Sequence, residues 1–245
     1  MNQTIKRIAR QWLGECMVGS INYYRFPEHR SAWGGPFNGQ SNRLQIFKAI
    51  IASIQPKAII ETGTHLGTTT ETMAETGLPV YTVEVHPRYY GFARARLWRK
   101  PNVKLRQGDS RAELKKLFEG PLRRRGDASL FFYLDAHWNA DLPLAEEIDI
   151  IFNRLHNAVV MIDDFQVPHD RGFGYDDYGP GKVLNAEYIG PIAEAHGLTI
   201  FYPSAPSQHE TGFRRGCAVL CKSADIVGKL EEISLLDRRP ASARY

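Results

Sequence analysis

The 245-residue chain has only three cysteines and no apolar run long enough to cross a membrane. Cys16, Cys217 and Cys221 cannot form a disulfide framework, and the apolar run 217–221 favours buried thiols over metal ligands. The N-terminus has no apolar core followed by a small-residue cleavage site, the mark of a secretory signal. These absences predict a cytoplasmic protein without a membrane partner.

Charge of one sign is also scarce. The formal net charge is +4, and the Arg123–Arg125 cluster is typical of a solvated loop. No basic patch interleaved with aromatic residues stands out, so we expect no nucleic-acid partner. Apolar content of 43% and charged content of 24% are ordinary for a globular protein, and the length suits one large or two small domains.

One stretch, residues 58–70, organises the chain. Ala58–Ile60 are consecutive apolar residues, which predicts a buried parallel strand. Gly63 and Gly67 then permit a sharp turn and a close approach of the backbone to a ligand. Thr68–Thr70 suit the start of a helix, where free N–H groups need partners.

The spacing within this stretch distinguishes two cofactor classes. A dinucleotide fingerprint reads G-x-G-x-x-G, whereas this chain reads E-x-G-x-x-x-G-x-T from Glu61. An acid at the strand end suits a positively charged ligand, such as the amino group or sulfonium of S-adenosylmethionine, and would repel a pyrophosphate. Glu84 follows 84 − 61 = 23 residues later, at the end of Val80–Val83, where a carboxylate can accept both ribose hydroxyls. An incidental acid in a generic α/β turn is the weaker interpretation.

From residue 57 onward, predicted strands and helices alternate. This pattern predicts an α/β fold, a Rossmann-like doubly wound seven-stranded sheet that is mostly parallel, with an antiparallel last strand and N-terminal helices. The expected strands are Ala58–Glu61, Val80–Val85, Val103–Gln107, Ser129–Asp135, Ala158–Asp163, Leu198–Tyr202 and Gly216–Cys221. The expected helices lie near 1–18, 41–54, 68–76, 87–99, 110–118, 143–155 and 182–195, and the tail after Lys222 holds one more.

We expect two units along the chain: an N-terminal helix with a cofactor-lid segment over 1–40, and a Rossmann-like domain over 41–245. Tyr23–Gly39 is rich in glycine and aromatic residues and ends in Trp33-Gly34-Gly35-Pro36-Phe37-Asn38. Such a segment ahead of a domain can be a lid over a site or a plain connection. For helix 41–54 the expected inner face comprises Leu44, Phe47, Ile51 and Ile54.

Five consecutive predicted strands end at or near an acid: Glu61, Glu84, Asp109, Asp135 and the pair Asp163–Asp164. Ligands of open α/β sheets bind beyond the carboxyl ends of the strands. We therefore expect Asp109 to meet an adenine edge, with Ser110 as a hydroxyl partner. Either residue also suits a helix N-cap, and the two roles are compatible.

Asp135, Asp163 and Asp164 follow neighbouring parallel strands, which lie about 5 Å apart. Three carboxylates crowded without a cation would raise one another's pKa, and all-oxygen ligands favour Mg²⁺ over zinc. A zinc site using His137 or His169 lacks paired Cys/His spacing. The competing interpretation is that Asp163 and Asp164 cap a loop or form salt bridges.

Over Asn38 to Phe173, the chain resembles class I S-adenosylmethionine-dependent methyltransferases, nearest to the metal-dependent O-methyltransferases of the catechol O-methyltransferase type. Glu61–Thr69 is similar to that family's first cofactor motif, and Val83–Pro87 to its ribose segment. Leu134-Asp135 with His137-Trp138 is similar to its aspartate-histidine-tryptophan run, with Ala136 as one extra residue, and Phe37–Gln40 is similar to its closing loop.

The resemblance implies a role for each matched position. Cofactor contacts are implied at these residues: Asn38, Glu61, Gly63, His65, Gly67, Thr69, Glu84, Val85, Asp109, Ser110, Asp135 and Trp138. Mg²⁺ ligands are implied at Asp135, Asp163 and Asp164. The implied reaction is O-methylation of a hydroxyl on a small molecule.

One departure concerns the general base. The catechol enzymes place a lysine just after the tryptophan, where this chain has Asn139. Asp135 and His137 are the candidate catalytic residues, and His169 is a further candidate, because imidazole titrates near neutrality. The polar loop Asp170–Lys182 is expected to line the acceptor pocket, and the sequence identifies neither the acceptor nor the oligomeric state.

Three other functions compete. A nucleic-acid N-methyltransferase would carry a polar-Pro-Pro-aromatic run after the fourth strand, where this chain has Asp135-Ala136-His137-Trp138. An NAD-dependent oxidoreductase is opposed by the glycine spacing and by Glu61. A relative with the same fold but a hydroxylase-like or binding role stays open.

Overall fold

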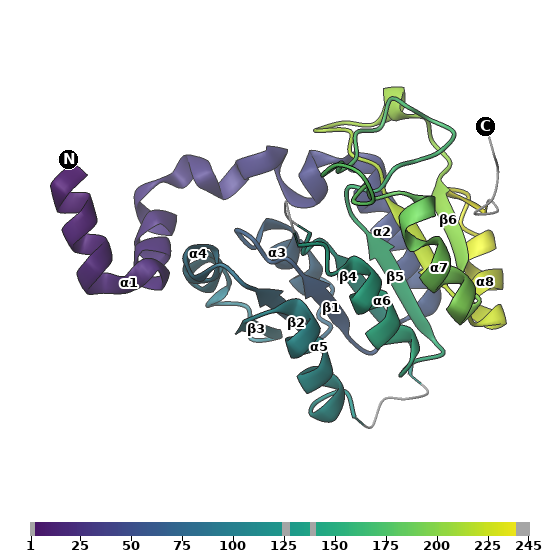
Figure 1. Cartoon of the computed structure of the whole chain (residues 1–245), viewed down its shortest axis with the longest axis horizontal. Coiled ribbons are helices and arrows are strands. Elements are labelled where there is room, and N and C mark those ends of the chain that lie inside the picture. Colours follow the sequence, from purple (N-terminus) through teal and green to yellow (C-terminus); the bar gives the residue numbers. More distant parts are fainter. Residues whose placement is uncertain (1–2, 124–127, 138–140, 239–245) are drawn as a thin grey trace.

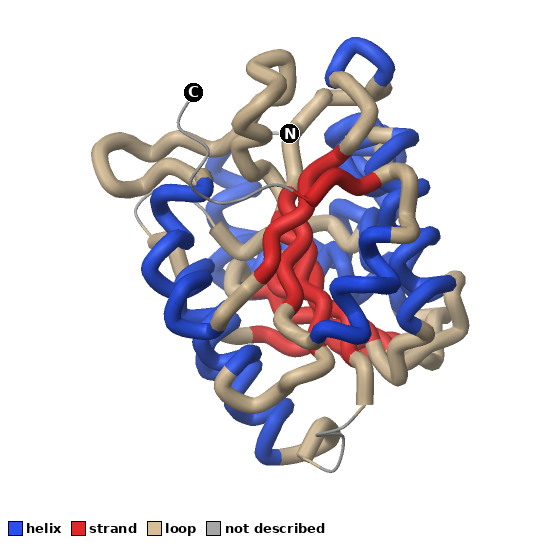
Figure 2. The backbone as a smooth tube through the Cα atoms, turned by 90° about the vertical axis from the view of Figure 1, so that its right-hand side faces the viewer, coloured by secondary structure: helices blue, strands red, loops and turns tan. Residues whose placement is uncertain are grey.

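The computed structural model describes residues 3–123, 128–137 and 141–238. Its centre is a sheet in the order β3-β2-β1-β4-β5-β7-β6-β8, with helices on both faces (Figures 1 and 2). The strands are β1 Ile59–Thr62, β2 Val80–Glu84, β3 Val103–Gln107, β4 Leu130–Leu134, β5 Ala158–Ile162, β6 Thr199–Pro203, β7 Ala218–Cys221 and β8 Leu236–Arg238. The pairs among β1 to β5 are parallel, and β7 runs antiparallel to β5 and β6.

The helices are α1 Gln3–Arg25, α2 Ser41–Ile54, α3 Thr68–Ala74, α4 Pro87–Leu97, α5 Ser110–Glu119, α6 Leu144–Phe152, α7 Ala186–His196 and α8 Ala224–Glu231, with 3-10 segments η1 Pro27–Gly34, η2 Pro36–Gly39 and η3 Ser207–His209. One apolar cluster packs α5, α6 and α7 against the sheet, and a second packs α2, α3 and α8 against its other face. The predicted doubly wound α/β architecture is therefore confirmed.

The predicted strand count of seven is wrong, because β8 adds an eighth strand antiparallel to β6. β8 has three residues, of which only Leu236 is apolar and buried. Such a short segment shows neither an apolar run nor an alternating pattern. For this reason it was predicted to be part of a terminal tail. Its position is set by pairing with Phe201–Pro203 rather than by its own composition.

Residues on successive positions of the strands serve opposite faces, as the strand geometry requires. Ile60, Phe132 and Val160 belong to the cluster under α5–α7, whereas Phe131 and Val159 belong to the cluster under α2, α3 and α8. Cys217 and Cys221 are free thiols buried in the second cluster, as predicted. Both faces being covered explains why β4 and β5 are apolar without interruption, whereas β3 at the edge of the sheet includes Lys104 and Arg106.

The N-terminal helix is longer than predicted and packs on α4. Its axis breaks at Gly14, and its first part projects away from the sheet (Figure 1). After the break, α1 and α4 cross closely, since a Cβ at Gly19 would overlap the carbonyl of Arg88 and one at Gly91 would overlap the carbonyl of Cys16. Ser20 Oγ donates to the Gly91 carbonyl at 2.8 Å.

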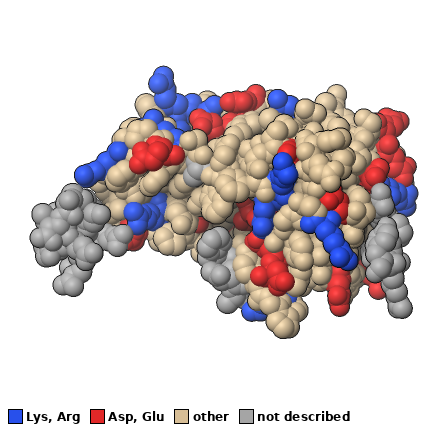
Figure 3. All heavy atoms as spheres, turned by 90° about the horizontal axis from the view of Figure 1, so that it is seen from above, with Lys and Arg blue, Asp and Glu red and all other residues tan. Residues whose placement is uncertain are grey.

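In the described part of the chain, every helix is too short or too polar to span a bilayer. Basic and acidic side chains interleave over the face seen from above (Figure 3). The segments between α1 and α2 (26–40), after β5 (163–185) and between β6 and β7 (204–217) are joined to one another by backbone hydrogen bonds such as Phe213 N to Asn38 O and Gly174 N to Arg214 O. Together they border the carboxyl ends of the parallel strands. The predicted division of the chain at residue 40 stays a prediction.

Candidate functional site

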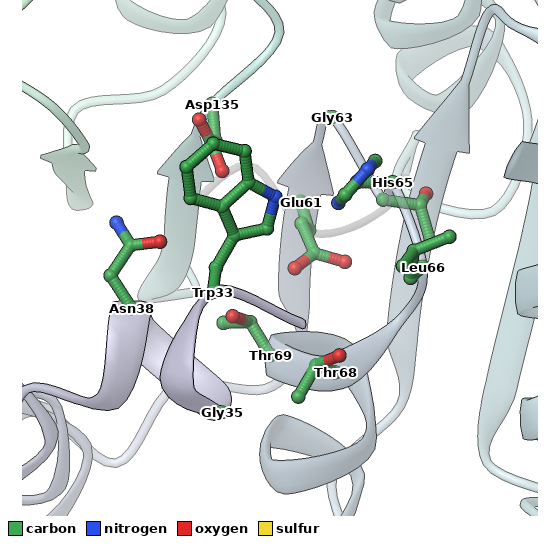
Figure 4. Close-up of a pocket in the computed structure, with 11 residues that line it drawn as sticks. Trp33, Gly35, Asn38, Glu61, Gly63, His65, Leu66, Thr68, Thr69 and Asp135 are labelled. Carbon is green, nitrogen blue, oxygen red and sulfur yellow. The ribbon is translucent and has the colours of Figure 1, made fainter. Parts of the chain in front are cut away.

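A pocket opens where β1 and β4 end. Its open space is about 370 Å³, counted to its solvent-exposed mouth. Figure 4 shows Asp135, Glu61, Trp33 and Asn38 around this space, with His65 and Leu66 of the β1–α3 turn on one side and Thr68 and Thr69 of α3 on another. The lining residues are Trp33, Gly35, Asn38, Glu61, Gly63, Thr64, His65, Leu66, Thr68, Thr69 and Asp135.

Glu61 is the buried acid of this pocket. Its Oε2 accepts hydrogen bonds from the hydroxyls of Thr70 and Thr82, the latter at 2.6 Å. Burial raises the pKa of Glu61 to about 7, and the neighbouring Glu84 carboxylate adds to this shift against the two hydroxyl bonds. Both of these hydrogen bonds from described residues are accepted by Oε2. Oε1 is therefore available for a cationic group in the pocket.

Glu84 lies beside the pocket rather than in its wall. Its two carboxylate oxygens accept backbone N–H bonds from His65 and His86, each at 2.7 Å. Burial raises the pKa of Glu84, although these N–H bonds oppose the shift. Glu84 therefore holds the turn that carries His65. Val85 follows with 67% of its surface exposed.

Asp109 and Ser110 sit at the start of α5, outside the pocket lining. Asp109 is the N-cap, since its Oδ1 accepts from the N–H groups of Arg111 and Ala112. Its carboxylate also pairs with Arg111, whose hydrogen bond lowers the pKa of Asp109. The N-cap role weighed from the sequence is thus present, and an adenine contact stays a prediction.

Beside the pocket, Asp135, His137 and Asp164 bring three possible ligand atoms within 4.8 Å of one another. His137 is buried, and its Nε2 has no hydrogen-bond partner among the described residues, although Asp176 Oδ2 lies 3.6 Å away and Asp135 Oδ1 3.8 Å away. Burial lowers the pKa of His137, so the imidazole is neutral at neutral pH. A neutral imidazole aimed between carboxylates is suited to hold a divalent cation.

Asp135 belongs to both the pocket and this group. Burial at the pocket base raises its pKa well above the ordinary value, and the carboxylates of Asp164 and Glu61 add to the shift. Because 35% of the side chain is exposed, water moderates this effect. A cation would relieve the repulsion that these acids exert on one another.

Asp163, the third predicted ligand, has other partners. It pairs with the buried guanidinium of Arg43 and accepts a hydrogen bond from Tyr133 Oη at 2.6 Å and from Asn38 Nδ2 at 3.3 Å. It is not part of the group formed by Asp135, His137 and Asp164. The salt-bridge reading weighed from the sequence describes these contacts.

The outer rim of the group comes from two loops. Arg215 donates from Nε to Asp164 Oδ1 at 2.8 Å, and its Nη2 pairs with Asp176. Tyr178 Oη donates a hydrogen bond to Asp176. Burial raises the pKa of Tyr178, and the contact with Asp176 raises it further. The predicted acceptor loop 170–182 therefore reaches the candidate cation group through Asp176.

Of the predicted cofactor residues, the structure brings six into the pocket lining: Asn38, Glu61, Gly63, His65, Thr69 and Asp135. Gly67 is the N-cap of α3 with φ 73° and is not part of the pocket lining. Trp138 lies outside the described residues, as does Asn139. His169 is not part of the cation group. Sequence reasoning missed Arg43, Tyr133 and Arg215. In the sequence, Arg43 and Tyr133 are single polar residues within largely apolar elements, and Arg215 is an arginine shortly before a strand.

The residues of the pocket fit S-adenosylmethionine. The buried Glu61 provides a negative charge for an amino group or sulfonium, and the turn from Gly63 to Thr69 provides backbone groups and hydroxyls. A dinucleotide pyrophosphate would meet the Glu61 carboxylate instead of a helix N-terminus alone. Asp135 lines the same space, and His137 lies beside it, with 3.8 Å between His137 Nε2 and Asp135 Oδ1.

Comparisons with other proteins agree with this arrangement at the level of fold. No family model and no curated protein matches the chain. Among solved structures, a Klebsiella pneumoniae protein provisionally assigned as an O-methyltransferase matches with a TM-score of 0.51 at 18% identity, over 89% of this chain and 96% of that one.

Two further solved structures are similar. A Staphylococcus aureus protein provisionally assigned as a caffeoyl-CoA O-methyltransferase has a TM-score of 0.52 at 16% identity, over 74% of this chain and 83% of its own. The methyltransferase domain of a bacterial Hen1 protein has a TM-score of 0.52 at 16% identity, over 75% of this chain and 98% of its own. The chain therefore has the Rossmann-like fold of solved methyltransferases, which confirms the resemblance found in its sequence as a likeness of fold.

Proposed function

We propose that this protein is an S-adenosylmethionine-dependent methyltransferase that methylates a hydroxyl of a small molecule with the help of a divalent cation, Mg²⁺ being the first candidate. The proposal depends above all on the pocket at the carboxyl ends of β1 and β4, which combines the buried Glu61 with Asp135. The shared fold of the solved methyltransferases supports the same cofactor.

Bound S-adenosylmethionine supplies an electrophilic methyl group, and a divalent cation lowers the pKa of a hydroxyl that it binds. The residues of this chain hold and orient both reactants. Asp135, His137 and Asp164 would hold the cation, and the group contains an imidazole, so Mn²⁺ is a candidate beside Mg²⁺. Positioning the acceptor oxygen in line with the methyl group would provide most of the acceleration.

The proton of the acceptor hydroxyl needs a base. Asp135 is the candidate with the best access, because it lines the pocket, where an acceptor hydroxyl can approach it. His137 is neutral and buried beside it, at 3.8 Å from Nε2 to Oδ1. We propose that one carboxylate oxygen of Asp135 takes the proton, while its other oxygen, His137 and Asp164 would hold the cation.

The acceptor enters from the side of Asp176 and Tyr178. The rim formed by Asp164, Asp176 and Arg215 is polar and mixed in charge, which suits a hydroxyl-bearing small molecule. Trp33 adds an exposed aromatic wall at the pocket mouth, in edge contact with Phe213 at 5.5 Å between ring centroids. We propose no nucleic-acid or membrane partner.

Calorimetric titration of the wild-type chain tests the cofactor class. We expect S-adenosylhomocysteine to bind and NAD to leave no measurable heat, each measured with and without Mg²⁺, because the Glu61 carboxylate opposes a pyrophosphate. Tight NAD binding, or the absence of S-adenosylhomocysteine binding, would refute the proposal. Binding of the nucleoside without any response to Mg²⁺ or Mn²⁺ would leave a cation-free enzyme or a binding protein.

The affinity for S-adenosylmethionine should depend on pH through Glu61. The folded pKa of Glu61 is about 7, and a cationic ligand binds the ionised carboxylate better. Affinity is therefore expected to rise with pH and to level off above about 7, with a loss of roughly tenfold per pH unit below that value. Titrations from pH 5.5 to 8.5 measure this slope.

The matched control is Glu61→Gln, which keeps an oxygen to accept from Thr70 and Thr82 but carries no charge. In this variant affinity should be low and nearly independent of pH, with the neighbouring Glu84 and Asp135 left to contribute any remaining slope. An unchanged slope would mean that another group governs it.

A further inference from the structure

Two adjacent aspartates at the end of β5 have the same chemistry but opposite surroundings. The side chain of Asp163 is 3% exposed and that of Asp164 is 19% exposed. Asp164 has φ 51°, and its N–H donates to Asp163 Oδ1 at 2.8 Å. This left-handed turn of the backbone sends the two carboxylates to different neighbours.

Every contact of Asp163 points toward the protein interior or the lid segment (residues 33–40). Its Oδ1 faces the guanidinium of Arg43, and its Oδ2 accepts from Tyr133 Oη at 2.6 Å and Asn38 Nδ2 at 3.3 Å. Asn38 is a wall of the cofactor pocket (Figure 4). Asp163 therefore ties the lid segment to the sheet.

Arg43, on α2, is the cation that balances Asp163. It is 1% exposed, and its Nη2 donates to the Gly216 carbonyl at 2.9 Å and to the Arg215 carbonyl. A buried guanidinium paired with a buried carboxylate compensates both charges and their lost hydration. With this charge and three other donors in place, Tyr133 Oη, Asn38 Nδ2 and the Asp164 N–H, Asp163 has little left to offer a metal ion.

The same arginine reaches the cation group through the backbone. The carbonyl of Arg215 accepts from Arg43 and from Gln40 Nε2 at 2.8 Å, and the Arg215 N–H donates to Gln40 Oε1 at 3.1 Å. The side chain of Arg215 then holds Asp164 and Asp176. Lid segment and cation group are thus fixed to one buried charge.

We infer that the two aspartates divide the work: Asp163, held by Arg43, positions Asn38 and the lid segment over the cofactor, whereas Asp164 alone of the pair serves the divalent cation. Arg43 is a positioning residue that acts through Asp163 and through the backbone of Arg215. This inference rests on the proposed function, because it assigns the cofactor and the divalent cation of the proposed site to separate aspartates.

The test compares Asp163→Asn with Asp164→Asn, using S-adenosylhomocysteine and MnCl₂ as separate probes of the full chain. Asp163→Asn is expected to weaken S-adenosylhomocysteine binding about tenfold or more, mainly through faster dissociation, because a loose lid releases the ligand. Its Mn²⁺ affinity, read by electron paramagnetic resonance of free Mn²⁺, should change less than threefold. Asp164→Asn should reverse this pattern.

Asp163→Asn leaves Arg43 without its counter-charge, so further variants guard against a folding defect. Asn38→Ala removes the lid contact without unpairing a charge and should also speed S-adenosylhomocysteine dissociation. Arg43→Lys keeps the charge and should retain more of the ligand affinity than Arg43→Met. A general loss of stability would lower both probes together and would not follow this order.

Equal loss of Mn²⁺ affinity in Asp163→Asn and Asp164→Asn would overturn the inference, as would unchanged S-adenosylhomocysteine dissociation in both Asp163→Asn and Asn38→Ala. If the wild type binds S-adenosylhomocysteine but no Mn²⁺, the metal part of the proposed function fails, and the dissociation rates still decide the role of Asp163. Absence of S-adenosylhomocysteine binding by the wild type would remove the proposed function and the inference together.

Discussion

Asp135→Asn is expected to lower the rate of methyl transfer about 10³-fold or more and to remove measurable Mn²⁺ binding. Asp135 lines the cofactor pocket and belongs to the cation group, so the substitution takes away a ligand and the candidate base at once. General-base catalysis alone contributes about 10²–10⁴-fold. Release of S-adenosylhomocysteine in the presence of an acceptor, and Mn²⁺ titration, measure the two losses.

The same substitution should not weaken the fold. Burial, together with the carboxylates of Asp164 and Glu61, raises the pKa of Asp135 in the folded chain. At a pH above the pKa of an unfolded aspartate, the ionised Asp135 therefore lowers the free energy of unfolding, and an asparagine avoids this cost. Without a cation, the unfolding temperature of Asp135→Asn at pH 8 should therefore equal or exceed that of the wild type. Asp225→Asn, on the exposed side of α8, is the matched control for losing a carboxylate. A lower unfolding temperature together with intact Mn²⁺ binding would assign Asp135 a structural role.

The layered fold was predictable because its signals are local. The apolar runs of β1, β4 and β5 mark strands covered on both faces, and the acids that follow them mark the carboxyl edge of the sheet. The six pocket-lining residues predicted from the sequence come from the lid segment, from the stretch between the end of β1 and the first turn of α3, or from the end of β4. At this edge, chain order and strand order together place the side chains.

Orientation within that edge was not predictable. Glu84 accepts the backbone N–H groups of His65 and His86, which the spacing did not predict, whereas the N-cap role of Asp109 was one of the alternatives weighed from the sequence. Which lone pairs a carboxylate keeps for a ligand depends on the turn beside it, and sequence spacing carries no information on that. The left-handed backbone of Asp164 is a further example, since it separates two neighbouring carboxylates.

The inner face of α2 was predicted in part: Phe47 and Ile54 are buried as expected. Leu44 and Ile51 were predicted to face inward and are only partly buried, whereas Ile46, Phe47, Ile50, Ile54 and the charged Arg43 are buried. Arg43 lies on the same helical face as Phe47 and Ile50, at spacings of four and seven residues, and this sharing of a face was overlooked in the sequence. A buried arginine requires a buried acid as its partner. That acid is Asp163, which lies 120 positions further along the chain. Long-range pairing of this kind escapes any local pattern.

Gly63→Ala is expected to destabilise the folded chain by about 2–5 kcal/mol and to eliminate cofactor binding. Gly63 has φ +85°, and a Cβ there would overlap the backbone carbonyl of Asp135. The left-handed backbone costs an alanine about 1–2 kcal/mol, and forcing atoms into a packed site costs a further 1–3 kcal/mol or so. The overlap involves backbone on both sides, so the turn after β1 and the end of β4 must separate, which displaces Asp135 from the pocket.

Gly77→Ala separates these two costs. Gly77 ends the turn after α3 with φ +75°, and a Cβ there would meet nothing within 4 Å. Its substitution should cost only the backbone part, about 1–2 kcal/mol, and should leave S-adenosylhomocysteine affinity as in the wild type. Urea unfolding of both variants gives the difference, which measures how closely β1 and β4 must approach at the point where Glu61 and Asp135 meet the ligand. Equal destabilisation of the two variants would mean that this close approach yields without cost, and Asp135 would then be free to move relative to the β1 turn.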